Sequence, residues 1–260
     1  MDADLPTFLT LGEGAQARSI AVRARTGATP GVFWMGGLKS DMKGMKAEAL
    51  ARWAAERGRA MVRFDYSGHG ESSGEFAACT IGQWLEDTLA VFDAFCRGPQ
   101  IVVGSSMGGW LALLLARELK RRAVRPGGAA SIVGLVLIAP AVDFTEELIW
   151  KRLPREAMRE MEQKGFWTRP SQYAQDPYPI TRHLIEEGRK HLLLDGLIEP
   201  GCPVRILQGV ADPDVPWEHA VNLVSRLAQD DVVLTLVKDG DHRLSRPEDV
   251  ERLIRAVAEL

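Results

Sequence analysis

The chain has 260 residues, of which 46% are hydrophobic and 26% charged, and its formal net charge is -3 at pH 7. This length is enough for one large α/β domain or two small ones, and the composition is that of an ordinary globular protein. Nucleic-acid binding needs an excess of Lys and Arg over a broad surface, which this charge balance does not provide. We therefore expect no nucleic-acid partner.

The cellular compartment is predicted from apolar runs and cysteines. No apolar run approaches the roughly 18 residues of a membrane span, so we expect none. Residues 1–6 lack the features of a signal or transit peptide. Cys79, Cys96 and Cys202 are odd in number and form no Cys-x-x-Cys pair, which argues against a disulfide framework and a zinc knuckle. We therefore expect a cytoplasmic protein whose cysteines are small packing residues.

Taken in chain order, apolar runs and turn residues predict strands and helices in alternation as far as residue 142. The predicted strands cover residues 8–9, 19–24, 32–35, 60–64, 101–103 and 132–139. The predicted helices cover residues 46–57 and 80–95, and a third begins after Ser106 and ends near Arg121. Most of these strands are continuously apolar. This pattern is typical of an α/β fold with a mostly parallel, doubly wound sheet covered by helices on both faces.

Residues 143–200 have a different character. They combine helical charge patterns with breaks at Pro170, Pro177 and Pro179, and they contain no buried-strand run. The alternation then resumes with strands at 204–208 and 232–237 and helices at 217–227 and 247–260. We therefore predict an α/β core formed by residues 1–142 and 201–260, with residues 143–200 inserted as a helical cap over the sheet.

Aromatic residues are scattered through this predicted cap. They are Phe144, Trp150, Phe166, Trp167, Tyr173 and Tyr178. They could serve packing alone, or they could form an apolar roof for an acyl or aryl substrate.

The pentapeptide Gly104-Ser105-Ser106-Met107-Gly108 joins a predicted strand to a predicted helix and fits Gly-x-Ser-x-Gly. In a nucleophile elbow the serine lies on such a sharp, strained turn at the end of a strand. The flanking glycines are needed because side chains there would collide with the neighbouring strand or helix. A short pattern also occurs in ordinary turns, so the function depends on what the rest of the chain supplies.

A nucleophilic serine needs a base, and the base needs an orienting acid. In a doubly wound sheet these groups lie on loops at the carboxyl ends of strands. His242 follows the last predicted strand in a glycine-containing loop. In the loop after the penultimate strand both Asp212 and Asp214 qualify, and we prefer Asp212 because it comes first and Pro213 holds it in a turn. The order Ser106, Asp212, His242 is that of the α/β-hydrolases.

The tetrahedral intermediate of acyl transfer needs two backbone N–H donors. The amide of Met107, directly after the serine, is one candidate. Gly36-Gly37-Leu38 follows the 32–35 strand, and its glycines permit close approach of the backbone, so the amide of Leu38 is the other. These two residues are the predicted oxyanion hole.

Metal and cofactor chemistry is not predicted. The loop 65–74 is rich in Gly and Ser, but no Gly-Lys-Ser/Thr follows, which argues against a nucleotide site. Asp65 is instead expected to anchor that loop. No His, Asp or Glu cluster has metal-ligand spacing, so we expect neither a metal nor a cofactor.

Several sequence blocks extend the match beyond the pentapeptide. They are residues 30–37, 63–68, 98–110, 215–217 and 241–243. On these blocks, from about Pro30 onward, the chain resembles the α/β-hydrolase-domain family that includes the mitochondrial palmitoyl-protein thioesterase and mycophenolic acid acyl-glucuronide esterase, together with its bacterial relatives. The resemblance implies ester or thioester hydrolysis with Ser106 as nucleophile, Asp212 as acid and His242 as base. The chain departs from the mitochondrial member in having Gly36-Gly37 for Pro-Gly and Leu38 for tyrosine, and from residues 1–6 we expect no mitochondrial presequence.

The sequence therefore predicts a serine hydrolase that cleaves a small-molecule carboxylic ester or acyl thioester through an acyl-enzyme, with no prediction of its oligomeric state. The alternatives are a C–C bond or amide hydrolase with the same three residues, and a small-ligand binder without catalysis. A histidine base must be neutral, so activity should decline below pH about 6.5, where an ordinary imidazole takes up a proton.

Overall fold

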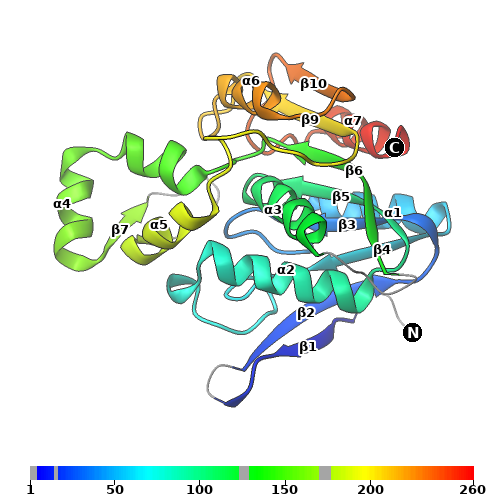
Figure 1. Cartoon of the computed structure of the whole chain (residues 1–260), viewed down its shortest axis with the longest axis horizontal. Helices are drawn as coiled ribbons and strands as arrows, with labels where there is room; N and C mark the ends of the chain where they lie inside the picture. Colours follow the sequence, from blue (N-terminus) through cyan, green and yellow to red (C-terminus); the bar gives the residue numbers. More distant parts are fainter. Residues whose placement is uncertain (1–4, 15–16, 123–128, 170–176) are drawn as a thin grey trace.

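The computed structural model describes residues 5–14, 17–122, 129–169 and 177–260. An eight-stranded sheet lies at its centre, in the order β1-β2-β4-β3-β5-β6-β9-β10 (Figure 1). β2 pairs antiparallel with both β1 and β4, and the remaining neighbours are parallel, which confirms the predicted sheet. The strands are β1 (Thr7–Leu11), β2 (Arg18–Arg25), β3 (Ala28–Met35), β4 (Arg59–Phe64), β5 (Pro99–Ser105), β6 (Ser131–Ile138), β9 (Val204–Gly209) and β10 (Val232–Val237).

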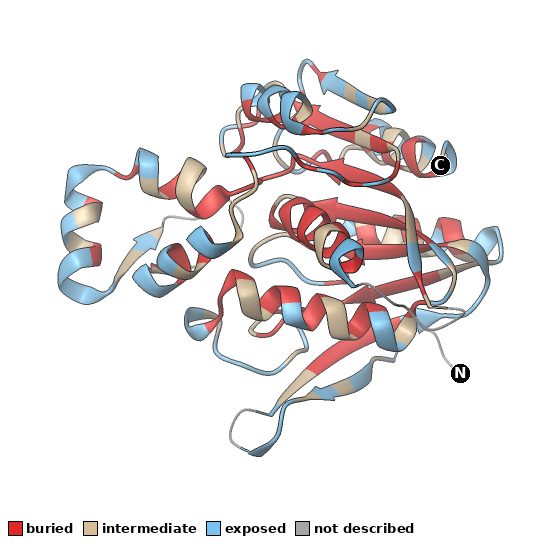
Figure 2. Cartoon of the chain, in the orientation of Figure 1, coloured by how far each residue is buried: buried red, intermediate tan, exposed pale blue. Residues whose placement is uncertain are grey.

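Helices cover both faces of this sheet, as its apolar strands require. One face packs against α2, α3 and α6, and the other packs against α1 and α7, so there are two apolar layers. Figure 2 shows the central strands almost wholly buried between these helices. The helices are α1 (Met45–Glu56), α2 (Ile81–Phe95), α3 (Met107–Arg121), α6 (Trp217–Arg226) and α7 (Pro247–Ala258).

In the cap stretch, residues 143–200, the elements α4, β7 and α5 lie beyond one end of the sheet, on the left of Figure 1, and Ile198 near its end pairs with the backbone at the end of α6. The cap stretch contains η3 (Thr145–Ile149), η4 (Trp150–Arg152), α4 (Arg155–Lys164), β7 (Phe166–Arg169), β8 (Tyr178–Thr181), α5 (Arg182–Gly188) and η5 (Arg189–His191). The expectation of helices alone is wrong, because β7 and β8 form a small antiparallel sheet of their own. Each strand has four residues and is only partly buried, too short and too polar for the apolar run that marks a core strand. Pro170 and Tyr173 lie outside the described residues.

Asp143 joins the two ends of the cap stretch. Its backbone has a left-handed φ of 55°, and its buried carboxylate accepts hydrogen bonds from the amides of Leu193 and Leu194 at 2.8 to 3.0 Å. Burial raises the pKa of this carboxyl to about 6. The first residue of the stretch therefore binds the backbone near its end. The division into core and cap stays a prediction.

Two smaller predictions are confirmed. Cys79, Cys96 and Cys202 are buried and free, as expected of packing residues. The Asp65 carboxylate accepts hydrogen bonds from the amides of Met42 and Glu71 at 2.7 and 2.8 Å, and so anchors its loop. Within the described ranges, every helix is too short or too polar to cross a membrane.

Candidate active site

The turn at Ser106 is as tight as the pentapeptide predicts. Ser106 follows β5 with φ 54° and ψ -118°, and α3 begins at the next residue. A Cβ on Gly104 would lie 2.3 Å from the carbonyl oxygen of Gly108, and one on Gly108 would lie 2.2 Å from that of Met35. Both distances are far below van der Waals contact, so only glycine fits at either position. The predicted reason for the two glycines is confirmed.

Three side chains from three loops form a hydrogen-bonded chain. The Ser106 hydroxyl lies 3.1 Å from His242 Nε2, and His242 Nδ1 donates to Asp212 Oδ2 at 2.8 Å. The loops follow β5, β9 and β10, whose carboxyl ends meet at one edge of the sheet. The Asp212 side chain is completely buried, and that of His242 is 15% exposed. The structure thus brings together the three residues that chain order singled out.

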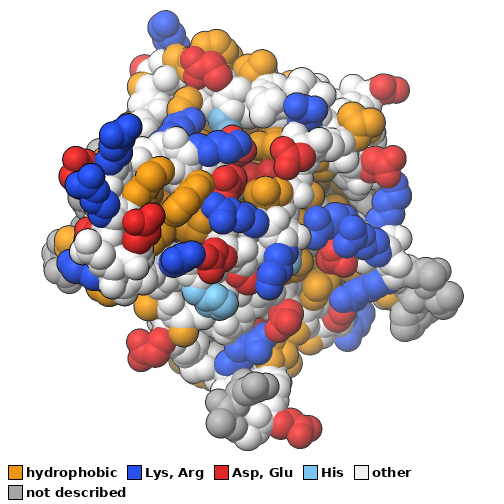
Figure 3. Space-filling view, turned by 60° about the vertical axis from the view of Figure 1, so that its left-hand side comes forward, with side chains coloured by type: hydrophobic (Ala, Val, Ile, Leu, Met, Phe, Trp, Pro, Cys, Tyr) orange, Lys and Arg blue, Asp and Glu red, His pale blue; other side chains and the backbone are white. Residues whose placement is uncertain are grey.

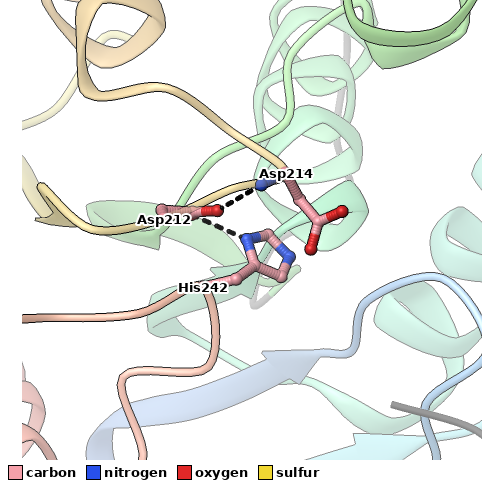
Figure 4. Close-up of side chains that lie close together, drawn as sticks. All are labelled: Asp212, Asp214 and His242. Carbon is pink, nitrogen blue, oxygen red and sulfur yellow. Dashed lines mark hydrogen bonds and ion pairs between the residues drawn. The ribbon is translucent and has the colours of Figure 1, made fainter. Parts of the chain in front are cut away.

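The two candidate acids differ in their partners. The other carboxylate oxygen of Asp212, Oδ1, accepts from the amides of Asp214 and Val215 at 2.8 and 2.9 Å, which fixes its orientation. Asp214 forms an ion pair with Arg169 of β7 at 2.7 Å. In Figure 4, Asp212 lies at one nitrogen of the His242 ring and the Asp214 carboxylate lies beside the ring on its other side. The geometry favours Asp212 as the partner of His242.

These three residues each offer a ligand atom within 4.8 Å of one another. Metal binding would compete with bonds that already exist, since Asp212 Oδ2 holds His242 and Asp214 Oδ1 holds Arg169. We therefore assign no metal to this cluster.

The loop after β3 passes beside Ser106. A Cβ on Gly37 would lie 3.3 Å from the Ser106 Cβ, which shows how closely this backbone approaches the serine. Leu38 from this loop and Met107 from the start of α3 both line the cavity that contains Ser106. The two residues predicted to supply the oxyanion donors therefore line the same cavity as the serine.

A cavity of about 650 Å³ opens at Ser106 and His242. The cap stretch lines it with apolar and aromatic side chains from Phe144, Leu148, Ile149, Trp167 and Tyr178. The core contributes a more polar wall that includes Lys39 and Asp41 of the loop after β3, Lys46 of α1 and Arg243 of the loop after β10. Figure 3 shows hydrophobic side chains exposed on this side of the molecule, bordered by charged ones. Three of the predicted aromatic residues, Phe144, Trp167 and Tyr178, therefore line the cavity rather than serving packing alone.

Three of the other four histidines have structural environments, and His183 is exposed on α5. His69 is buried among aromatic rings, and burial lowers its pKa to about 4. His219 is hydrogen-bonded to the carbonyl of Val142 at 2.9 Å, and His191 to Glu187 at 2.8 Å.

Arg169 is a residue of this site that the sequence did not single out. Nothing in the local pattern of the cap stretch marks it, because its partner Asp214 lies 45 positions away.

Comparison with known proteins identifies the family. A family model described as serine aminopeptidase, S33, matches residues 32–183, more than half of the chain. The mitochondrial palmitoyl-protein thioesterase ABHD10 of Mus musculus is 38% identical over 243 residues, which cover 93% of this chain and 78% of the relative. The chain belongs to this family of α/β-hydrolases. It is an enzyme, an ester or thioester hydrolase, as predicted.

Two solved structures show that the hydrolase shares this fold from end to end. A putative hydrolase from Agrobacterium vitis S4 is 49% identical, with a TM-score of 0.93, over 98% of this chain and 97% of that one. The mouse α/β-hydrolase domain-containing protein 10 is 36% identical, with a TM-score of 0.83, over 97% of each chain. The predicted α/β-hydrolase fold is confirmed.

The predicted cytoplasmic location is wrong. The curated relatives, at 36 to 38% identity, are each named as mitochondrial proteins. The prediction depended on apolar runs, on residues 1–6 and on unpaired cysteines. Unpaired cysteines indicate only that thiols stay reduced and do not distinguish one reducing compartment from another.

Proposed function

We propose that the hydrolase cleaves carboxylic esters or acyl thioesters by nucleophilic catalysis at Ser106, with His242 as base and Asp212 as acid. The observation that carries this proposal is the continuous chain of hydrogen bonds from the Ser106 hydroxyl through His242 to the buried Asp212. Its serine end opens into the cavity, where a substrate carbonyl can reach it. A neutral imidazole with a fixed partner on Nδ1 presents Nε2 as the acceptor that a serine proton needs.

In the first half of the reaction Ser106 Oγ attacks the carbonyl carbon, and its proton passes to His242 Nε2. The imidazolium that forms is stabilised by Asp212 at Nδ1. Collapse of the tetrahedral intermediate releases the alcohol or thiol, which takes the proton from His242 and leaves the acyl group on Ser106. In the second half water repeats these steps and releases the acid, which restores the free serine.

The amides of Met107 and Leu38 are the donors that we propose for the negative oxygen of each tetrahedral intermediate. Their position beside Ser106 supports this role. Each such donor is typically worth about 3 kcal/mol of transition-state stabilisation. Because the backbone supplies the donors, the role does not require a particular side chain at either position.

We propose that residues 143–200 act as a cap that supplies the acyl site, over a core of residues 1–142 and 201–260. The apolar side chains of Phe144, Leu148 and Trp167 face the cavity and suit an acyl chain or aryl group. That the curated relatives are named palmitoyl-protein thioesterases supports an apolar acyl group joined through sulfur.

A panel of p-nitrophenyl esters and acyl-CoA thioesters of graded chain length tests this function. We expect hydrolysis of both classes, with kcat/KM rising with acyl length until the apolar wall is filled. Ser106→Ala should abolish both activities. Turnover by Ser106→Ala equal to that of wild type, or no turnover of any ester or thioester by the wild type, would contradict the proposal.

A further inference from the structure

A second carboxylate lies beside His242, and the proposed mechanism does not use it. A carboxylate oxygen of Asp214 lies within 4.8 Å of a ring nitrogen of His242 (Figure 4). Asp214 also lines the cavity, together with Ser106 and His242. Its Oδ2 is buried and has no hydrogen-bond partner among the described residues. A negative charge at this distance, in a partly buried site, acts directly on the imidazole.

Arg169 lies where it balances this charge. It ends β7 in the cap stretch, and its guanidinium donates to Asp214 Oδ1 at 2.7 Å. The side chains of Arg169 and Asp214 are 27% and 22% exposed, so solvent screens the pair only in part. The core therefore contributes the carboxylate, and the cap stretch contributes the cation.

We propose that Arg169 is a positioning residue, which the cap stretch supplies to the reaction by pairing with Asp214 and offsetting the charge of that carboxylate beside His242. With Arg169 in place, Asp212 is the carboxylate that stabilises the imidazolium form of His242. Without it, the uncompensated Asp214 stabilises the imidazolium, and the base stays protonated to a higher pH. The inference rests on the proposed function of His242 as the base.

The other charged and titratable groups around His242 come from five places. They are Asp212 in the same loop as Asp214, Asp241 and Arg243 beside His242, Lys39 and Asp41 of the loop after β3, Lys46 of α1, and Tyr178 of β8. Lys46 donates to the backbone carbonyl of Arg243, and Asp241 accepts from the amides of Arg243 and Leu244. The contacts of Lys46 and Asp241 do not involve Arg169, so its replacement leaves them in place. Tyr178 is the cross-strand partner of Arg169 and interacts with its guanidinium, so the replacement changes the surroundings of Tyr178 as well as the charge balance at Asp214.

The test is the pH dependence of kcat/KM for a p-nitrophenyl ester, whose acidic limb reports the base of the free enzyme. In Arg169→Met the midpoint of the acidic limb should shift to higher pH by about half to one pH unit. This is the size expected for one uncompensated charge near 5 Å in a partly solvated site. In Asp214→Asn the midpoint should shift to lower pH, because the positive charge of Arg169 is then uncompensated. In the double variant it should return close to the wild-type position, and Arg169→Lys should restore it.

Arg189→Met is the matched control. Arg189 is also a cap-stretch arginine in an ion pair, with Glu146 at 2.8 Å, but it does not line the cavity. Its replacement should leave the limb within about 0.2 pH units of wild type.

Two outcomes would overturn the inference. One is that Arg169→Met lowers kcat/KM equally at every pH with an unmoved limb, which indicates a merely structural role. The other is that the single-variant shifts do not cancel in the double variant. The proposed function fails separately: the wild type would then show no acidic limb, or Ser106→Ala would remain active.

Discussion

Two aspartates stand two positions apart in the loop after β9, yet their carboxylates have different surroundings. Asp212 is fully buried and holds His242, whereas Asp214 pairs with a cation from the cap stretch. The sequence could narrow the acid to this loop, since loops at the carboxyl ends of parallel strands meet at one edge. It could only favour one aspartate over the other, because the choice depends on where each side chain points.

Replacement of the two aspartates by asparagine should separate their roles. Asp212→Asn leaves the size of the side chain intact but removes the charge that stabilises the imidazolium, so kcat/KM should fall by about 10⁴-fold. Asp214→Asn should lower kcat/KM at the optimum pH by less than tenfold. Steady-state kinetics on one ester measure both. A larger loss for Asp214→Asn would reverse the assignment of the acid.

Gly104, the glycine before the turn at Ser106, should not tolerate a larger residue. A Cβ at Gly104 would overlap the backbone of Gly108, so Gly104→Ala should destabilise the fold by at least about 1 to 3 kcal/mol, the usual cost of overpacking a core. Gly196→Ala is the control, because a Cβ there meets nothing within 4 Å. Urea unfolding measures both, and equal stability of the two variants would argue against the tight turn.

At the scale of elements, the core strands and helices were predictable and the cap stretch was not. Continuous apolar runs mark a strand buried on both faces, which is the environment of β3, β5 and β6. β7 and β8 are partly exposed and carry mixed side chains, so no periodic signal distinguishes them from a loop. Asp143 likewise has no local signature, because its partners, Leu193 and Leu194, lie 50 and 51 positions further along the chain.

Asp143 should make stability depend on pH. Burial raises its pKa in the folded protein from its ordinary value near 4 to about 6, so the folded state holds this proton more tightly than the unfolded chain. The wild type should therefore lose stability relative to Asp143→Asn as pH rises from about 4 to 6, by at most about 3 kcal/mol. Urea unfolding at several pH values measures the difference, which should be constant below pH 4 and above pH 7. A difference that does not change with pH would contradict this account.

For the whole molecule, the arrangement of the site follows from topology. Ser106 and His242 are 136 positions apart, and they meet because β5 and β10 end at the same edge of one parallel sheet. A general rule of α/β sheets is therefore enough to find them from sequence. Arg169 comes from a segment outside that sheet, where no such rule applies. The cellular location was mispredicted for a different reason, because reduced cysteines do not distinguish one reducing compartment from another.

The central claim is that Ser106 is the nucleophile. A fluorophosphonate probe phosphonylates an activated serine hydroxyl with loss of fluoride, and intact-protein mass spectrometry counts the adducts. We predict one adduct on the wild type, one on Ser105→Ala, which removes the neighbouring hydroxyl, and none on Ser106→Ala. An unlabelled wild type, or a Ser106→Ala variant that labels as fast as the wild type, would contradict the account.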